Sequence, residues 1–300
     1  MQAQQDVEVS LARLERAVTD AVAVAGASVV RVNRRRGAGS GLAWTDTLVV
    51  TANFHTPDQP TVTLAGPDGP REVAARLVGR DPGTDVAVLA VDAGGLTPLV
   101  RRSPGPLGAG QLGFALARPG QAIRSSLRAL GVVGPAIRTP AGGRLDAYLE
   151  TDRALPRGFA GGPLVDLAGA LVGMNTRTLC PGADVCVPVS TLARVVDALV
   201  AHGRIARGYL GLAVQPAAIA PAVSDGRGRG ALVVALDEGG PAAHGGLLVG
   251  DVIIAVDGEI VDGPAPLQLA IGDRPGATAV VELVRGGVRT SASVAVGTRP

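Results

Sequence analysis

The spacing of hydrophobic residues follows two different periods along this chain. Across residues 7–25, apolar side chains recur at three- and four-residue steps, which is the spacing of one face of an amphipathic α-helix. These positions are Leu11, Leu14, Val18 and Val22. From residue 28 to about residue 189 the pattern changes to short β-rich runs divided by glycine and proline. The sequence therefore predicts an N-terminal helix followed by many short strands.

The short runs are spaced as in antiparallel barrels and sandwiches. The clearest of them cover residues 28–32, 47–51, 61–64, 86–91, 127–133, 147–151 and 170–175. A second helix is predicted after them at 190–202, where Ser190 is a favourable N-cap and Gly203 ends the apolar stripe.

A second unit begins near Gly208. It contains a strand-like run, a short helix with a tight turn, and a buried strand that ends in the turn Asp257-Gly258. A helical stretch and a final pair of strands follow. The first strand is expected near residues 231–235, the short helix, turn and buried strand within 239–258, and the remaining elements near 266–271, 279–285 and 288–296. The predicted organisation is a helix over 1–27, a β-rich domain over 28–205 and a smaller domain over 206–300.

Composition describes the core and excludes one class of partner. Hydrophobic residues make up 47% of the chain but aromatic residues only 2%, so valine, leucine and alanine must build the core. The 43 glycines and 22 prolines favour short strands over long helices. All 28 basic residues are arginines, dispersed apart from 34–36, and the net charge is only +2. A nucleic-acid surface needs clustered basic residues with stacking aromatics, so no nucleic-acid partner is expected.

The N-terminus has neither a basic segment nor an apolar core of the kind that a secretory signal carries. The apolar stretch 21–30 is too short to span a bilayer, so no membrane span is expected. The sequence as written predicts a cytoplasmic protein, or a periplasmic or extracellular one if an export segment is missing.

Neither a metal nor a cofactor is predicted. The three histidines, His55, His202 and His244, are scattered along the sequence. Cys180 and Cys186 bracket a short loop, which leaves open either a disulfide across the loop or two small core thiols.

Three segments carry ordered motifs. The run 239–258 carries Gly-Gly-Pro-Ala-Ala, then Gly-Asp-Val-Ile and Val-Asp-Gly, and resembles a PDZ domain. The segments 79–89 and 155–165 resemble those that bring the triad aspartate and the nucleophile in the trypsin-like domain of the HtrA (DegP) family. The resemblance implies a mainly β fold: an N-terminal helix, a trypsin-like double six-stranded β-barrel over 28–205, and an α+β PDZ domain over 206–300.

The resemblance also assigns the positions of the active site. Asp85 is the triad aspartate, and Gly158 belongs to the loop that forms the oxyanion hole. Alanine stands at the nucleophile position, Ala160, and phenylalanine at the base position, Phe54, with His55 one residue later. Because neighbouring side chains point in different directions, His55 reaches the base position only if the backbone bulges by one residue. A displaced base and a solvent-edge histidine beside a core phenylalanine both remain open.

Serine acyl transfer needs a nucleophile, an imidazole, an orienting carboxylate and N–H donors for the oxyanion. The methyl group of Ala160 cannot attack a carbonyl, and Phe159 replaces a small polar residue of the family pattern. We therefore expect an inactive protein that binds peptides, unfolded proteins or C-terminal tails as a chaperone or adaptor. The alternatives are a serine endopeptidase of protein quality control, with an atypical site or an introduced Ala160, and an inactive subunit within trimers of an active relative. A homotrimer is a further possibility that the family implies.

The segment Gly208–Leu212 resembles the carboxylate-binding loop of PDZ domains, whose successive N–H groups receive a peptide C-terminus. Helix residues of the same domain would complete an apolar socket for the last side chain. The predicted peptide-binding residues are Tyr209, Leu210, Gly211, Leu212, Leu267 and Ile271. Alternatively, these leucines are ordinary core residues and the groove is occluded.

Overall fold

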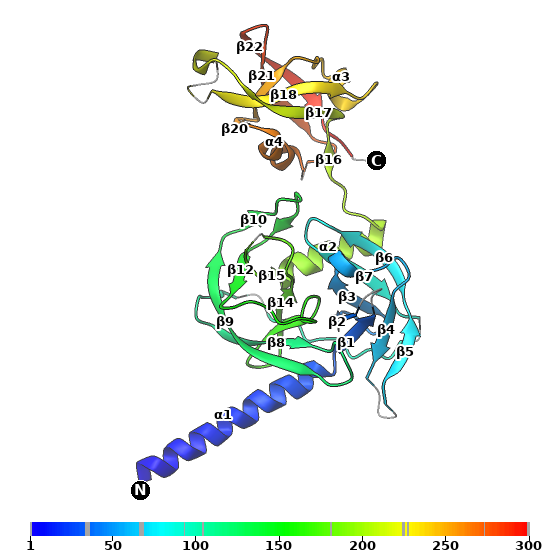
Figure 1. The fold of residues 1–300 in the computed structure, drawn as a ribbon, viewed down its shortest axis with the longest axis vertical. Helices are drawn as coiled ribbons and strands as arrows, with labels where there is room; N and C mark the ends of the chain where they lie inside the picture. The colour runs from blue at the N-terminus through cyan, green and yellow to red at the C-terminus, as the bar shows by residue number, and fades with distance from the viewer. Residues whose placement is uncertain are drawn as a thin grey trace. The chain divides into compact units, whose positions relative to one another are not determined.

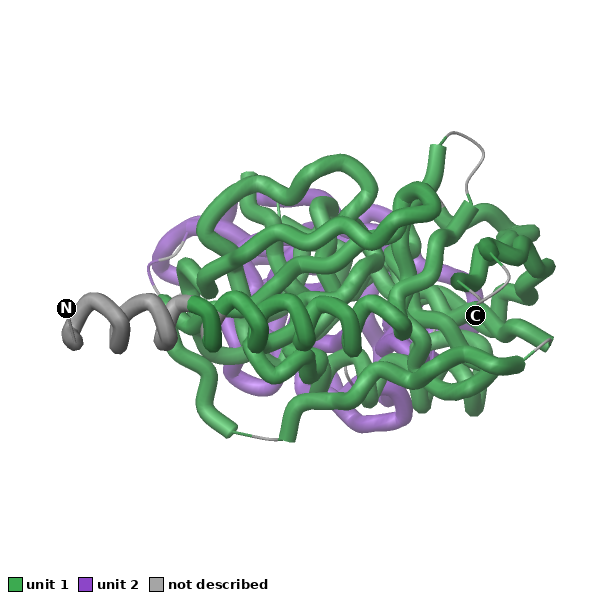
Figure 2. Tube along the Cα trace, turned by 90° about the horizontal axis from the view of Figure 1, so that it is seen from below, with its two compact units in different colours: residues 1–205 green, residues 206–300 purple. Residues whose placement is uncertain are grey.

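The computed structural model describes residues 2–33, 37–65, 69–92, 94–103, 105–180, 182–223, 226, 228–272 and 274–298. The side chains of residues 2–11, Leu14 and His55 lie outside this description. Two compact units make up the chain, residues 1–205 and residues 206–300 (Figure 2). In the described part of the chain, no helix combines the length and apolarity that a bilayer crossing requires.

The first helix, α1 (Gln2–Gly26), starts earlier than its apolar stripe predicts. Its last turns pack on the first unit, where Ala21 and Ala25 are buried and Val18 and Val22 are partly buried against the core. The positions Leu11 and Leu14 of the same stripe lie outside the described side chains.

The first seven strands form one antiparallel sheet in the order β5-β4-β1-β2-β3-β7-β6 (Figure 1). They are β1 (Val29–Asn33), β2 (Ala38–Ala43), β3 (Leu48–Ala52), β4 (Thr61–Leu64), β5 (Arg71–Ala74), β6 (Arg76–Asp81) and β7 (Val86–Ala90). The two edge strands, β5 and β6, are separated only by Ala75, so the sheet curls until its edges meet at this residue. The expected six strands become seven because one strand is broken there.

The next strands close into a six-stranded barrel in the order β12-β15-β14-β13-β8-β9. They are β8 (Leu112–Ala117), β9 (Arg124–Gly134), β12 (Tyr148–Thr151), β13 (Pro163–Asp166), β14 (Leu171–Asn175) and β15 (Val185–Pro188). A small hairpin, β10 (Ile137–Arg138) and β11 (Arg144–Leu145), interrupts them. The barrel leads into helix α2 (Val189–His202), which ends at Gly203 with a φ of 71°. No side chain caps the start of α2, so Ser190 is not the N-cap that its sequence position predicts.

The second unit is a sheet in the order β17-β18-β19-β21-β22, with β20 paired to β19 and a separate ribbon of β16 with β23. Its strands are β16 (Gly208–Tyr209), β17 (Leu212–Ala218), β18 (Arg229–Leu236), β19 (Val252–Val256), β20 (Glu259–Ile260), β21 (Thr278–Arg285), β22 (Val288–Ala295) and β23 (Gly297–Thr298). Its helices are α3 (Pro241–His244) and α4 (Pro264–Ile271), with single 3₁₀ turns at η2 (Pro221–Val223) and, in the first unit, η1 (Asn53–His55). The mainly β fold, a trypsin-like domain with a barrel followed by a PDZ domain, is confirmed.

Candidate functional site

The loop over residues 155–162 is a tight turn that depends on glycine. Gly158 and Gly161 adopt φ values of 90° and 87°, in the left-handed region that favours glycine. A Cβ on Gly161 would lie 2.2 Å from the carbonyl oxygen of Ser40, so no larger residue fits. The N–H of Gly161 donates to the Asn175 carbonyl at 2.9 Å, and that of Phe159 donates to Pro156 at 3.3 Å. The sequence prediction of a glycine-built loop therefore has a structural reason.

A buried serine fastens this loop to the first sheet. The hydroxyl of Ser40 donates to the Gly158 carbonyl at 2.8 Å and accepts the N–H of Arg118 at 2.8 Å. The Ser40 carbonyl in turn accepts the hydroxyl of Thr51 at 2.7 Å. Sequence reasoning did not select Ser40, which lies 118 residues from Gly158. This hydroxyl is fully buried and already donates one hydrogen bond and accepts another, so its role is structural and it is not available as a nucleophile.

The two residues at the centre of the loop have different environments. Phe159 is buried, with 3% of its surface exposed, in a core cluster with Leu155, Leu164 and Val172. Ala160 is half-buried, and its carbonyl accepts the N–H of Ser40 at 3.4 Å. The large apolar residue therefore anchors the loop in the barrel, and the position beside it presents only a methyl group.

Asp85 is a buried carboxylate, and each of its two oxygens accepts a hydrogen bond. It has 3% of its surface exposed and a positive φ of 54°. One oxygen accepts the backbone N–H of Phe54 at 2.8 Å, and the other accepts the hydroxyl of Thr176. The Asp85 carbonyl also accepts the N–H of Asn53, at 2.9 Å. These donors satisfy a charge that would otherwise be costly to bury.

The structure brings Phe54 next to Asp85 through its main chain. The Phe54 side chain is 60% exposed, so the expectation of a core phenylalanine is wrong. The reason is local: η1 turns the backbone N–H of Phe54 toward the carboxylate, and the ring stays in solvent. The direction of the His55 side chain lies outside the description, so its reach to the base position stays a prediction.

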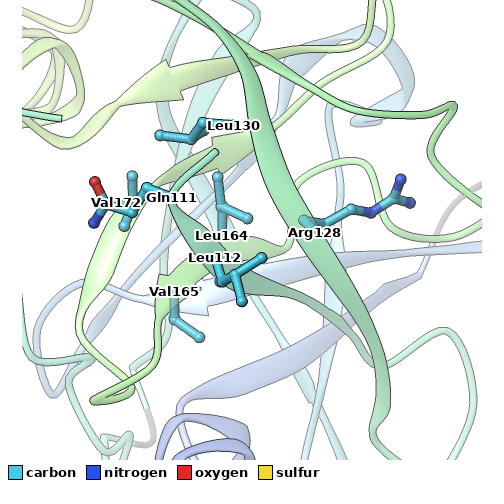
Figure 3. Close-up of a pocket in the computed structure, with 8 residues that line it drawn as sticks. Gln111, Leu112, Arg128, Leu130, Leu164, Val165 and Val172 are labelled. Atoms are coloured by element: carbon cyan, nitrogen blue, oxygen red, sulfur yellow. The ribbon is translucent and has the colours of Figure 1, made fainter. Parts of the chain in front are cut away.

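A buried arginine supports the segment that enters the loop. The Arg128 guanidinium donates to the carbonyls of Arg153 and Ala154 at 2.7 and 3.2 Å. Burial lowers the pKa of Arg128, the positive charge of Arg153 lowers it further, and the negative charges of Asp152 and Asp184 partly offset both effects. Figure 3 shows the guanidinium extending away from the small apolar cavity that the stem of Arg128 helps to line.

In the second unit, hydrogen bonds to backbone carbonyls fix the predicted carboxylate-binding loop in place. Gly211 has a φ of 71°, and its carbonyl accepts the N–H of Asp237 at 2.9 Å. The Leu210 carbonyl accepts the N–H of Ala242 at 2.7 Å, and the Tyr209 hydroxyl donates to Asp237. Within the described residues, the N–H groups of Leu210 and Gly211 donate to no backbone carbonyl.

The four apolar residues predicted for the peptide socket are core residues to different degrees. Leu210, Leu267 and Ile271 have 2%, 2% and 7% of their surface exposed and lie in the main cluster of this unit. Leu212 is partly buried against the same cluster. Leu212 is therefore the member of the set with the most surface left for a ligand.

Among the described side chains, no three histidine, cysteine, aspartate or glutamate residues gather as metal ligands would. Cys180 and Cys186 are separate thiols, and complete burial raises the pKa of Cys186.

Comparison with known proteins matches both units. The model of the trypsin-like peptidase domain matches residues 39–174, and that of the PDZ domain matches residues 208–296. Proteins named "Probable periplasmic serine endoprotease DegP-like" are 34% identical over 274 residues in Halomonas elongata and 35% identical over 277 residues in Rhizobium meliloti. Each alignment covers 89% of this chain but only 57% and 54% of the relative. The chain thus spans about half the length of the curated relatives it matches.

Solved structures match this chain over almost their whole length. The HtrA-type protease AlgW with a decapeptide has a TM-score of 0.71 at 26% identity, covering 94% of this chain and 99% of that one. The serine endoprotease from Yersinia pestis has a TM-score of 0.71 at 27% identity, covering 94% and 98%. The chain is therefore of the HtrA/DegP type, a trypsin-like peptidase domain followed by a PDZ domain.

Proposed function

We propose that this chain is a proteolytically inactive HtrA/DegP-type protein that binds peptides or unfolded segments as a chaperone or adaptor. The observation that carries the proposal is Ala160, a methyl group at the nucleophile position of a loop held by backbone hydrogen bonds. Phe54 stands at the base position and Asp85 at that of the triad aspartate.

The side chain beside Asp85 supports the loss of catalysis. In a serine triad the carboxylate accepts a hydrogen bond from the imidazole and so orients the base. Here its oxygens accept the backbone N–H of Phe54 and the Thr176 hydroxyl, and the phenyl ring has no N–H to donate to the remaining lone pairs. Without a nucleophile, the oxyanion donors and binding alone supply only about 10³–10⁴-fold acceleration over water, far below the rate of a working protease.

The backbone of the loop supports retained binding. Gly158 keeps its positive φ, and its N–H donates to no described backbone carbonyl. An N–H in this position can receive the carbonyl of an extended peptide without any hydroxyl nearby. The trypsin-like unit therefore still binds unfolded segments although it no longer cleaves them.

Peptide binding by the PDZ unit has separate support. Strand β17 lies at the edge of its sheet, beside the Leu210 and Gly211 N–H groups. An extended peptide can add to such an edge while its C-terminal carboxylate accepts the N–H groups at the strand's start. AlgW, which shares this two-domain architecture, is described with a tripeptide and with a decapeptide.

The names of the curated relatives bear on the compartment and on one alternative function. They place the relatives in the periplasm, and we assign this chain to the same compartment in place of the cytoplasm that the sequence predicts. The same names favour a serine endopeptidase as the second candidate. Trimer formation, alone or with an active relative, stays a prediction.

Peptide binding and hydrolysis are tested on the full chain. Octapeptides selected from a randomised library with free C-termini should bind with measurable affinity in fluorescence anisotropy, and their C-terminal amides should bind at least tenfold more weakly. The amide is the matched control because it differs only at the C-terminal carboxylate, to which the Leu210 and Gly211 N–H groups are proposed to donate. Failure to select any binding peptide overturns the PDZ part of the proposal, and casein hydrolysis by the rigorously purified chain overturns the inactive part.

A further inference from the structure

The open edge of the PDZ sheet contains a proline. Strand β17 pairs with β18 on one side, and no other described strand pairs with it. In the register of this pair, Pro216 stands opposite Ala231. In an antiparallel pair, facing residues alternate between exchanging two hydrogen bonds and exchanging none. Proline has no N–H to exchange, so the pair Pro216–Ala231 is of the second kind, and the backbone of Pro216 faces the open edge.

The same alternation fixes which neighbours face that edge. The register shifts between Ala213 and Val214, where the partner strand advances by one extra residue, Val234. The bulge therefore lies on β18, and β17 keeps its regular two-residue period. Leu212 and Val214 consequently present their N–H and C=O groups to the open edge, as Pro216 presents its C=O alone.

A ligand strand on this edge would have a defined direction and start. The Leu210 and Gly211 N–H groups lie at the N-terminal end of β17, so a carboxylate received there begins an antiparallel strand that runs along Leu212 and Val214. The side chains of Leu212 and Val214 are partly buried against the core, and helix α4 packs beside this strand. Ligand residues next to this segment therefore meet apolar surface as well as backbone groups.

We propose that Pro216 limits the PDZ ligand to a short C-terminal strand of about four residues. This inference rests on the proposed peptide binding and deepens it. Counting back from the carboxylate, the third ligand residue faces Val214 and exchanges two backbone hydrogen bonds. The fifth faces Pro216, where its carbonyl finds no N–H donor and the pyrrolidine ring occupies the edge. Residues beyond the fourth therefore add little affinity.

The test compares ligands of different lengths on the full chain. The selected octapeptide is truncated from its N-terminal end to six, four and three residues, each with a free N-terminus, because an acetyl carbonyl on the tetrapeptide would take the place of the fifth residue's carbonyl. For the unmodified chain we expect the affinity to rise from three to four residues and then to stay within about twofold. In the Pro216→Ala variant, the octapeptide should bind at least about threefold more tightly than the tetrapeptide, because one backbone hydrogen bond is restored.

Two controls separate this effect from general changes in the strand. The variant Gln215→Ala changes an exposed neighbour whose backbone faces β18, and it should keep the plateau at four residues. Tetrapeptide affinity should be the same in Pro216→Ala and in the unmodified chain. A continued rise in affinity beyond four residues in the unmodified chain, or an unchanged length dependence in Pro216→Ala, overturns the inference alone. Absence of binding at every length overturns the proposed peptide binding and this inference with it.

Discussion

Replacement of Asp85 tests whether this carboxylate now has a structural role. In Asp85→Ala, the buried Thr176 hydroxyl and the Phe54 N–H lose their acceptor. Hydrogen bonds to a charged group contribute about 1.5–3 kcal/mol each. The φ of 54° adds less than about 1 kcal/mol to this loss, because aspartate carries a Cβ too and tolerates the left-handed region only somewhat better than alanine does. We expect the free energy of unfolding of the first unit to fall by about 3–5 kcal/mol, since these contributions do not add fully.

Two further substitutions at this position separate the contribution of the hydrogen bonds from that of the backbone conformation. Asp85→Asn keeps an acceptor and a side chain that tolerates the left-handed region, so it should cost only about 1–2 kcal/mol. Asp85→Gly also removes the side chain, but glycine adopts the left-handed region without strain. This variant should therefore be about 1 kcal/mol more stable than Asp85→Ala.

The assay is urea unfolding followed by the fluorescence of Trp44. This is the only tryptophan of the chain, and it is buried in the core of the first unit, so its signal reports that unit. Peptide binding by the PDZ unit serves as the control and should not change. If Asp85→Ala unfolds within 0.5 kcal/mol of the unmodified chain, a value typical of surface substitutions, the structural role of this carboxylate is refuted.

Three other substitutions probe contacts described above. Gly161→Ala should cost about 3 kcal/mol or more in Trp44-monitored unfolding, because its Cβ would overlap the Ser40 carbonyl. Gly182→Ala, with a φ of 80° and open space around it, is the matched control and should cost only about 1 kcal/mol. Arg128→Met should cost about 2 kcal/mol in the same assay, as two carbonyls lose a buried donor; a cost equal to that of a surface arginine would contradict this.

The fourth concerns Asp251, which is almost fully buried. Burial alone would raise the pKa of Asp251, but hydrogen bonds from Arg285 and from the Leu248 N–H, and the charge of Arg285, bring it below its usual value. The resulting stabilisation is present above the unfolded pKa of about 3.9 and is lost as the pH falls through the folded pKa. Asp251→Asn should destabilise the PDZ unit at neutral pH by about 1–3 kcal/mol and flatten its acid unfolding, measured by circular dichroism. An unchanged acid transition would contradict this assignment.

Short-range sequence patterns predicted those elements whose conformation depends on neighbouring residues in the chain. The Asp257-Gly258 turn has positive φ at both residues, 46° and 79°, and joins β19 to β20 as a two-residue hairpin turn requires. Strand β2 was not among the predicted runs, because glycines interrupt its apolar pattern. A Cβ on Gly41 would lie 2.7 Å from the Val49 side chain, so close packing within the sheet selects glycine there.

Contacts between distant segments explain why the rest of the site escaped prediction. Ser40 and Thr176 bind groups that lie 118 and 91 residues away in the chain, and no periodicity marks either residue. The exposed ring of Phe54 is a similar case, because its position follows from the Asp85 carboxylate that holds its N–H. The prediction that the nucleophile and base positions are substituted needed only the sequence, whereas the partners of Asp85 required the fold.

The central claim, a protease fold kept for binding, is tested most directly by restoring the nucleophile. The purified chain and its Ala160→Ser variant are incubated with casein, and new peptide termini are measured by mass spectrometry alongside labelling by a serine-directed phosphonate. The account predicts no hydrolysis and no labelling for either protein, because Phe54 still stands where the base belongs. Hydrolysis by the unmodified chain, or activity gained by Ala160→Ser alone, would contradict it.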